Sequence, residues 1–415
     1  MEKQKCPEVR FKGFIDEWKQ IYLKDFGYTF TGLSGKTKDD FGHGDGQFIT
    51  YMNVFTNTIS DPKGVEKVEI DFNQNDVKYG DILFTTSSET PHEVGMSSVW
   101  LDEKPNTYLN SFCFGVRPFN NQTPYFLAYL LRSNSIRKQL IFLAQGISRY
   151  NISKTKAMEI NLSQPCLEER IQIGNFFQNL DQSITLQEKK LTQTQNLKKA
   201  MLEKMFPKAG SKQPEIRLKG FSGDWHVQCI GDFTRVGSGA RVHKEEWTSS
   251  GVPFFRSSDV VSSYKGNDNS KAYISFSLFE KLIQISGRLE KDDLLITGGG
   301  SIGIPYLVQN DEPLYSKDAD LIWIKKSSKF NSQYLYTFFS TSYFRSFIAS
   351  ISHIGTIAHY TIEQVKATPV CLPSIEEQVQ IGNFFKQLDG TLVLQKQQLQ
   401  TLKNLKQAFL EKMFV

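Results

Sequence analysis

The chain contains a long internal repeat, and this repeat constrains the fold more than any other feature. The segment "IQIGNFFQNLDQSITLQEKKLTQTQNLKKAMLEKMF" (171–206) aligns without gaps to "VQIGNFFKQLDGTLVLQKQQLQTLKNLKQAFLEKMF" (379–414), with about twenty of thirty-six positions identical. Shorter matches lie elsewhere: "PEVRFKGFIDEW" returns as "PEIRLKGFSGDW", and "GDILFTTSS" is similar to "DDLLITGGG". Between these landmarks the two copies differ strongly. The chain is therefore predicted to be two similar units in series, each with constant and variable parts.

The two constant segments are predicted to be helices that pair with each other. Each follows a proline and carries glutamates in its first turn, which is a helix start signal. Apolar residues then recur in the a/d pattern of a coiled coil, and each copy has a Gln and a Lys at the same two seam positions, which restricts register. The alternative is that each helix packs only on its own domain, but the seam has more turns than that requires. The predicted seam contains Phe177, Leu180, Ile184, Leu191, Met201, Phe385, Leu388, Leu392, Leu399, Leu402 and Phe409.

The order of domains and helices along the chain favours an antiparallel pair with a pseudo-two-fold axis. Thirty helical residues span about 45 Å, so the first helix would deliver the chain to the second domain and the second helix would return it. The predicted organisation is a first domain at 1–170, a helix at 171–206, a linker at 207–213, a second domain at 214–378 and a helix at 379–415.

Each variable domain is predicted to have a mixed α/β (α+β) fold. Short β-rich runs include "QFITYMNVF", "DILFTTS" and "SFCFGVRPF", with "VPFFRSSDV", "DLLITGG" and "DLIWIKK" as counterparts. A helix follows each set. The first is expected to start at Thr123 and Pro124, and the second at Asn331 or Ser332. The first helix should face the core through Phe126, Leu127, Leu130 and Leu131.

Composition excludes several classes of protein. The 415-residue chain is 39% hydrophobic and has no apolar run long enough to span a bilayer, and its first residues lack the apolar region of a secretory signal. Five scattered cysteines without a C-x-x-C pair fit a reducing cytoplasm, and the six histidines are not placed for a zinc site. The net charge of +5 is compatible with nucleic acid and equally with other functions.

The sequence has no motif that predicts catalysis. "GGGSIG" (298–303) matches a dinucleotide-binding pattern, but Pro305 and β-favouring residues follow it where a helix is required, so a turn between strands is expected. No G-x-x-x-x-G-K-[ST] motif occurs, and the Asp292–Asp293 pair lacks nuclease spacing. We therefore expect a chain that binds neither metal nor cofactor and that is not itself an enzyme.

Polar and basic loops occupy matching positions in the two copies. They include "TGLSGKTKDDFGHGDG", "TTSSETPHEVG", "SGARVHKEEW", "RSSDVVSSYKGNDNS" and "TGGGSIG". Such side chains can contact phosphates and base edges together, which DNA recognition requires. A single residue of this kind is more often part of a solvated turn. The recurrence of the whole set favours DNA binding.

These features together resemble the specificity subunit of type I restriction–modification systems, along essentially the whole chain. Two variable domains, two near-identical helices, the "PEVRFKGF" opening, "DLLITGGGSIG" and the segment that begins at Gly382 carry the resemblance. It implies two target recognition domains separated by an antiparallel coiled coil, each recognising one half of a bipartite, asymmetric site in double-stranded DNA. The location implied is the cytoplasm of a bacterium or archaeon.

The resemblance also implies partner subunits that carry the chemistry. Two methyltransferase subunits would bind S-adenosylmethionine and methylate adenine at N6, and two restriction subunits would use ATP and Mg²⁺ for translocation and cleavage. This chain would supply the DNA address. Two other functions stay open at this point: a coiled-coil adaptor that binds only proteins, and an enzyme with duplicated catalytic domains. The first would not need variable polar-basic loops, and the second should keep catalytic residues in both copies.

Position against the family's landmarks predicts the residues that contact DNA. Lys and Arg would mainly hold phosphates, and Asn53 and Arg256 would contact adenine and guanine edges. The first domain departs from the pattern because "TTSSETPHEVG" lacks the family's glycine-rich turn. The predicted contacts are Lys36, Lys38, Tyr51, Asn53, Thr86, Ser87, Ser88, Arg149, Arg241, His243, Lys244, Arg256, Ser258, Ser301 and His359.

Overall fold

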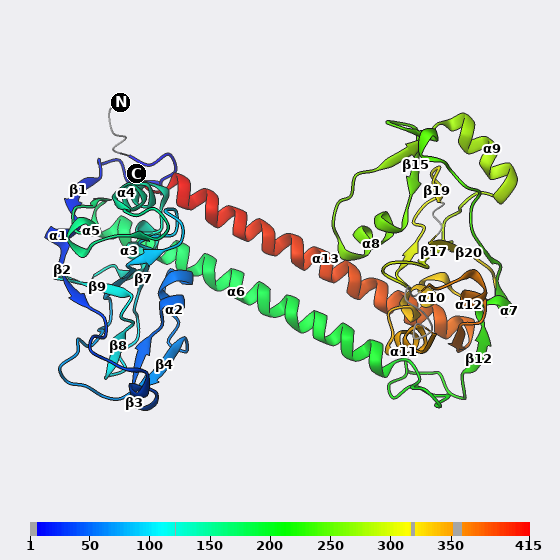
Figure 1. Cartoon of the computed structure of the whole chain (residues 1–415), viewed down its shortest axis with the longest axis horizontal. Coiled ribbons are helices and arrows are strands. Elements are labelled where there is room, and N and C mark those ends of the chain that lie inside the picture. Colours follow the sequence, from blue (N-terminus) through cyan, green and yellow to red (C-terminus); the bar gives the residue numbers. More distant parts are fainter. Residues whose placement is uncertain (1–5, 121, 317–319, 352–358) are drawn as a thin grey trace. The chain divides into compact units, whose positions relative to one another are not determined.

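The computed structural model describes residues 6–120, 122–316, 320–351 and 359–415, which form two compact units. Unit 1 contains Met1–Glu188 and Gln397–Val415, and unit 2 contains Lys189–Lys396. Two 38-residue helices, α6 (Leu167–Lys204) and α13 (Ile375–Lys412), each contribute residues to both units (Figure 1). The remainder of each unit is called here domain 1 and domain 2. Within the described residues, every helix is too short or too polar to cross a membrane.

Domain 1 is built on a four-stranded antiparallel sheet with the order β2-β9-β5-β7, beside a three-stranded sheet with the order β4-β3-β8. Two short pairs, β1-β11 and β10-β6, complete it. Its strands are β1 (Lys19–Tyr22), β2 (Gly27–Thr31), β3 (Phe41–Ile49), β4 (Val65–Val68), β5 (Ile82–Thr85), β6 (Ser87–Ser88), β7 (Ser97–Val99), β8 (Thr107–Leu109), β9 (Cys113–Pro118), β10 (Tyr150–Asn151) and β11 (Asn161–Gln164). Its helices are α1 (Leu23–Phe26), η1 (Lys38–Asp40), α2 (Tyr51–Thr56), α3 (Pro124–Leu130), α4 (Asn134–Leu143) and α5 (Lys154–Ala157).

Domain 2 repeats most of this topology and adds a strand, β14, to its second sheet. The sheet β13-β20-β17-β18 corresponds to the first sheet of domain 1, β14-β16-β15-β19 to the second, and β12-β21 to β1-β11. Its strands are β12 (His226–Cys229), β13 (Val236–Gly237), β14 (Trp247–Thr248), β15 (Val252–Phe255), β16 (Ala272–Ile274), β17 (Leu294–Thr297), β18 (Pro305–Leu307), β19 (Tyr315–Ser316), β20 (Leu321–Ile324) and β21 (Pro369–Leu372). Its helices are α7 (Ile230–Phe233), η2 (Lys244–Glu246), α8 (Ser257–Lys265), α9 (Phe276–Ser286), α10 (Ser332–Phe338), α11 (Ser342–Ile351) and α12 (Ile362–Lys366). The predicted mixed fold and internal repeat are confirmed.

The long helices pair antiparallel within each unit, as predicted. In unit 1 the rings of Phe176 and Phe409 lie 5.0 Å apart, and Lys403 pairs with Glu188 at 2.7 Å. The contacts of later residues in α6 are therefore made to earlier residues in α13, so the two helices run in opposite directions. In unit 2 Phe206 packs on Phe385 at 6.1 Å and Lys198 pairs with Asp389, which gives the same sense. Every predicted seam residue lies on the buried or half-buried side of its helix.

The seam lysines explain why the repeated octapeptide, "GNFFQNLD" in the first copy and "GNFFKQLD" in the second, ends in aspartate. Its last residue is Asp181 in α6 and Asp389 in α13. The seam lysine of the opposite helix pairs with each: Lys406 Nζ lies 2.6 Å from Asp181, and Lys198 bonds to Asp389. Tyr129 also donates to Asp181 at 2.8 Å. Because each bond joins one copy to the other, it fixes the alignment of the two helices.

A buried ion pair attaches the start of each domain to its long helix. Arg10 donates to both carboxylate oxygens of Glu169 at 2.7 Å, and Arg217 does the same to Glu377 at 2.8 Å. The glutamates are 0% and 1% exposed. The repeated "PEVR" and "PEIR" segments and the acidic first helical turns are therefore structural partners. Two-point arginine–carboxylate bonds of this kind are among the stronger polar contacts in proteins.

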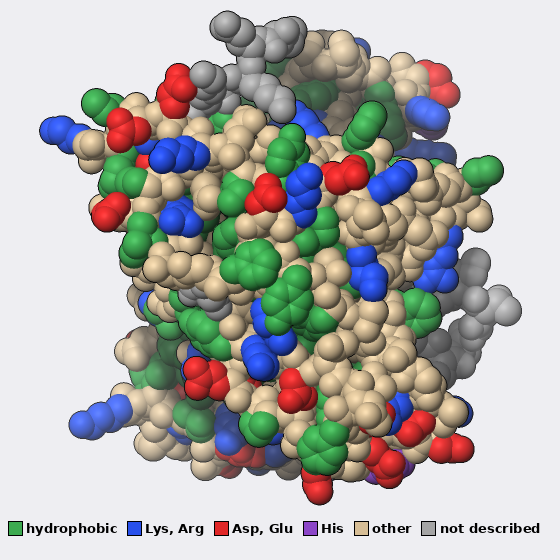
Figure 2. All heavy atoms as spheres, turned by 90° about the vertical axis from the view of Figure 1, so that its left-hand side faces the viewer, with side chains coloured by type: hydrophobic (Ala, Val, Ile, Leu, Met, Phe, Trp, Pro, Cys, Tyr) green, Lys and Arg blue, Asp and Glu red, His purple; other side chains and the backbone are tan. Residues whose placement is uncertain are grey.

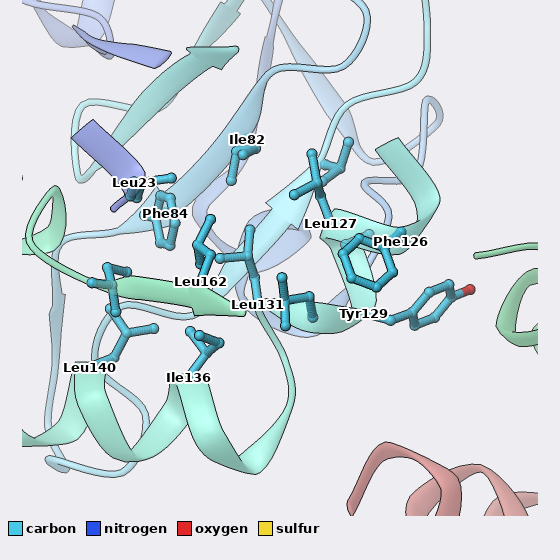
Figure 3. Packing of buried hydrophobic residues seen from close by; sticks show 14 of the residues in the cluster. Leu23, Ile82, Phe84, Phe126, Leu127, Tyr129, Leu131, Ile136, Leu140 and Leu162 are labelled. Carbon is cyan, nitrogen blue, oxygen red and sulfur yellow. The ribbon is translucent and has the colours of Figure 1, made fainter. Parts of the chain in front are cut away.

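Each core contains the end of the helix that starts from the other domain. In unit 1 the ring of Phe414 packs on Phe177 at 5.6 Å and on Trp18 at 6.3 Å. In unit 2 Phe206 packs on Trp225 at 6.1 Å and on Tyr334 at 5.4 Å. Figure 3 shows the core of unit 1, where side chains of α3 and α4 gather with those of β5 and β11. The four residues predicted for the core face of α3 are all buried.

Two runs that were expected to be strands throughout contain a strand followed by the start of a helix. The strand β3 ends at Ile49, and α2 starts after Thr50, whose hydroxyl caps it by accepting from the backbone N–H of Asn53. In domain 2, β15 ends at Phe255 and α8 follows. The prediction of strands through these positions was wrong because capping residues outweigh the β propensity of the aromatic residues nearby. The turn after β17 joins two antiparallel strands, as expected for "GGGSIG".

Candidate nucleic-acid interface

Three separate segments of domain 1 meet where β5 ends. Tyr51 at the start of α2 donates its hydroxyl to the carbonyl oxygen of Ser87 at 2.6 Å. The guanidinium of Arg149, which precedes β10, lies 3.2 Å from Ser87 Oγ. Burial raises the pKa of Tyr51, so its hydroxyl stays protonated and donates. The structure therefore brings together three of the predicted contacts, with the Arg149 side chain largely exposed.

Phe112 completes this cluster and was not predicted from the sequence. Its ring lies 5.9 Å from the Arg149 guanidinium and is 55% exposed. The hydroxyl of Thr86 donates to the Phe112 carbonyl at 2.8 Å, and Ser88 donates to Glu93 at 3.2 Å. The cluster formed by Tyr51, Thr86, Ser87, Ser88, Phe112 and Arg149 is called here the domain 1 cluster. The available sequence signal for this ring was an aromatic residue, Phe112, in the turn "NSFCF".

Two partly buried arginines support this region through backbone carbonyl groups. Arg132 donates to four carbonyl oxygens at 2.6–3.0 Å, three of them at the end of α2, and Arg137 donates to three in the loop 92–95. Burial lowers the pKa of each to about 10, so both remain charged at neutral pH. They therefore fix the end of α2 and the loop after β6.

Other predicted contacts in domain 1 lie apart from this cluster. Asn53 is 4% exposed, and its amide bonds to Asp61 and to the carbonyl of Gly64. Its hydrogen-bonding capacity is used within the fold, so the geometry does not support the predicted adenine contact. Lys36 pairs with Asp71 at 3.0 Å and with Asp40 at 3.7 Å, whereas Lys38 is exposed.

The equivalent region of domain 2 is the turn after β17. Gly298 donates to the carbonyl of Asp320 at 2.6 Å and accepts from the N–H of Tyr360. A Cβ at Gly299 would lie 2.3 Å from the side chain of Asp320, so glycine lets this carboxylate approach the turn closely. His359, at the position of Arg149, lies 3.6 Å from Asp320, and Ser301 is exposed in the same turn. These residues line or flank a cavity of about 380 Å³.

Arg256 is committed to its own domain. It donates to both oxygens of Asp259 at 2.7 and 3.0 Å and to the carbonyl of Ser270 at 2.6 Å. The geometry therefore does not support the predicted guanine contact. Ser258 lies next to it and accepts from Asn269 at 3.3 Å. Three more of the predicted contacts lie exposed on and before η2: Arg241, His243 and Lys244.

Unit 2 also contains a basic groove that the sequence did not predict. Two cavities of about 640 and 690 Å³ share Leu307, Gln309, Gln333 and Lys386 in their walls. Together they are lined by two aspartates, Asp292 and Asp389, and six lysines, Lys198, Lys265, Lys291, Lys326, Lys386 and Lys396. Lys386 and Lys396 replace Gln178 and Glu188 of the first copy. This charge difference between the copies was the available sequence signal.

Basic side chains do not gather on every surface. On the side of unit 1 that carries β1 and β2, Lys and Arg side chains are interspersed with acidic and hydrophobic ones (Figure 2). A mixed surface of this kind has no strong field for a polyanion. The domain 1 cluster and the groove of unit 2 are therefore better candidates for DNA binding than the described residues on the side shown in Figure 2.

The chain is thus built from one domain fold that occurs twice, with polar residues at matching strand ends. The family model for the "Type I restriction modification DNA specificity domain" matches the chain twice, over residues 15–196 and 222–404. The chain therefore belongs to this family of type I restriction–modification specificity subunits, and it contains two DNA specificity domains.

Relatives and solved structures agree with this assignment. A putative type I restriction enzyme MjaX specificity subunit of Methanocaldococcus jannaschii is 24% identical over 410 residues, covering 94% of this chain and 91% of that protein. The MjaVIII specificity subunit of the same organism is 23% identical, covering 68% and 66%. The type I S subunit from M. genitalium has a TM-score of 0.61 at 16% identity, covering 99% of both chains. The HsdS subunit from Thermoanaerobacter tengcongensis has a TM-score of 0.50 at 16% identity over 96% of both chains.

Proposed function

We propose that this chain supplies the DNA address of a type I restriction–modification complex, with each domain recognising one half of a bipartite, asymmetric site. The observation that carries the proposal is that one topology and one set of helix contacts occur twice around loops that differ. Equal scaffolds with unequal loops suit two different half-sites. A 38-residue helix is about 57 Å long, which exceeds one DNA turn of roughly 34 Å. Bases between the half-sites would then go unrecognised.

We infer that the long helices also bind the methyltransferase partners. Outside the seam, leucines are exposed at matching positions of both copies: Leu186 and Leu394 at 53% and 60%, and Leu197 and Leu405 at 45% and 43%. The two leucines of one helix are eleven residues apart, which places them on one face. Two methyltransferase subunits would suit this duplication. They would bind S-adenosylmethionine and methylate adenine at N6, and two restriction subunits would bind ATP and Mg²⁺.

The chain itself would contribute recognition and no chemistry. Asp293 is buried and accepts from the backbone N–H groups of Glu290 and Lys326, while Asp292 has a positive φ of 72°, so the pair shapes a turn. Among the residues common to both copies, Arg10, Glu169 and Asp181 recur as Arg217, Glu377 and Asp389 in structural ion pairs. This favours recognition over a duplicated enzyme, and the basic groove favours it over a protein-only adaptor. Genomic DNA as the target places the complex in the cytoplasm.

Lengthening the helices is expected to lengthen the gap in the DNA site. One heptad inserted into each helix adds about 10.5 Å, or about three base pairs, and preserves the seam. The half-sites should not change, although methylation should be slower because the added base pairs rotate one half-site about the DNA axis. Sequencing of methylated bases in cells with the altered chain measures the gap. An unchanged gap would refute the proposal that the length of the helices sets the distance between the half-sites.

Arg149 is expected to contribute one phosphate contact. For the complex with its methyltransferase subunits, Arg149→Gln should reduce the slope of log affinity against log salt by about one. Lys36→Gln is the matched control, because Asp71 and Asp40 already neutralise Lys36 and the slope should stay the same. Binding is measured by fluorescence anisotropy over a salt series. Equal slopes for Arg149→Gln and the unmodified chain would exclude this contact.

A further inference from the structure

A tight hairpin loop in domain 1 follows α4 and contains β10. Gln145 and Asn151 exchange two backbone hydrogen bonds of 2.9 and 2.8 Å, which close the loop of residues 146–150. Residues 145–151 are called here the finger. A Cβ at Gly146 would lie 2.0 Å from the carbonyl oxygen of Arg149, and its φ is 149°. The finger is therefore a tight loop with a defined shape that requires glycine at this position.

The tip of the finger presents an apolar side chain to solvent beside the domain 1 cluster. Ile147 is 96% exposed. Two residues later, Arg149 joins the finger to the cluster through Ser87 Oγ at 3.2 Å and the ring of Phe112 at 5.9 Å. Water around an isoleucine is unfavourable, and the side chain adds nothing to the core of domain 1. What separates Ile147 from other exposed apolar residues is its place in a closed loop that is bonded to the domain 1 cluster.

We propose that Ile147 is a specificity residue that packs on the 5-methyl group of a thymine in the half-site recognised by domain 1. This inference rests on the proposed function. The thymine methyl is the apolar group that bases present in the major groove, and a two-stranded ribbon fits that groove. A half-site that contains a methylated adenine must contain a paired thymine. A protein partner is a weaker candidate, because Ile147 is one apolar side chain between Gly146 and polar Ser148 and Arg149.

The test uses the full chain with its methyltransferase subunits and a duplex carrying the methylated motif. Each thymine of the first half-site is replaced in turn by deoxyuridine, which removes only the methyl group. At one position the unmodified complex should bind about four-fold more weakly, the effect of one buried methyl-sized group. The Ile147→Ala complex should show no such loss at that position. Thermal unfolding of Ile147→Ala should match that of the unmodified chain, because the side chain is exposed.

Ile285→Ala is the matched control. This isoleucine is 75% exposed on α9 of domain 2, so its removal should leave the deoxyuridine effect in the first half-site intact. The proposal is overturned if no position responds to deoxyuridine, or if the response persists in Ile147→Ala. If Ile147→Ala lowers the affinity for all duplexes equally, the proposal is overturned in favour of insertion of Ile147 between bases. If the Ile147→Ala chain fails to assemble with its partners, the proposal is overturned in favour of a protein contact. Absence of any gapped motif would instead contradict the proposed function.

Discussion

Replacing Arg10 with alanine is expected to lower the free energy of unfolding of unit 1 by about 3–5 kcal/mol. The substitution removes both hydrogen bonds to Glu169 and leaves a carboxylate that is 0% exposed without its countercharge. Arg217→Ala should have an effect of the same size in unit 2, because Glu377 is equally buried. Urea denaturation followed by circular dichroism measures both. The repeated opening segment is then required for stability in each copy.

A second substitution separates charge burial from simple loss of contact. Changing Glu169 to alanine in the Arg10→Ala background removes the stranded charge, so much of the lost stability should return. Lys208→Ala is the exposed control, because Lys208 and Glu215 pair at the surface and the free energy of unfolding should change little. If Arg10→Ala and Lys208→Ala have equally small effects, the buried pair does not hold the domain to the helix.

Alanine substitutions at two helix glycines are expected to change stability in opposite directions. A Cβ at Gly174 would lie 2.9 Å from the backbone nitrogen of Phe126, so Gly174→Ala should destabilise the chain by about 1–3 kcal/mol. Nothing lies within 4 Å of a Cβ at Gly390, so Gly390→Ala should stabilise it by about 0.5–1 kcal/mol through helix propensity. Thermal and urea unfolding of the two variants test this. A neutral or stabilising effect of Gly174→Ala would show that α6 does not approach α3 this closely.

The long helices could be predicted because their signal is periodic and occurs twice. The heptad pattern alone places the seam, and the repeat supplies the partner helix. The partners of the polar seam positions could not be predicted, because the lysine of one copy bonds to the aspartate of the other across some two hundred residues. The octapeptide therefore combines three functions: Gly174 allows close packing, Phe177 fills the core and Asp181 fixes alignment.

The candidate site was only partly predictable. Matching landmarks led to Tyr51, Ser87 and Arg149, which the fold brings together, although no sequence rule linked them. Asn53 and Arg256 have residue types that suit base edges, but their local surroundings use their hydrogen bonds. For Arg256 the signal was available, since Asp259 follows at the spacing of a capping pair. For Asn53 it was not, because its partners come from a turn whose shape only the fold defines.

The central claim is that the two domains recognise the two halves of one gapped DNA site, and the pattern of methylated adenines in the cell tests it most directly. Single-molecule sequencing would compare cells that express the methyltransferase subunits with and without this chain. We predict that removing the chain abolishes methylation at one motif made of two short, different half-sites with a fixed gap. An unchanged pattern, or the loss of a motif without a gap, would contradict this account.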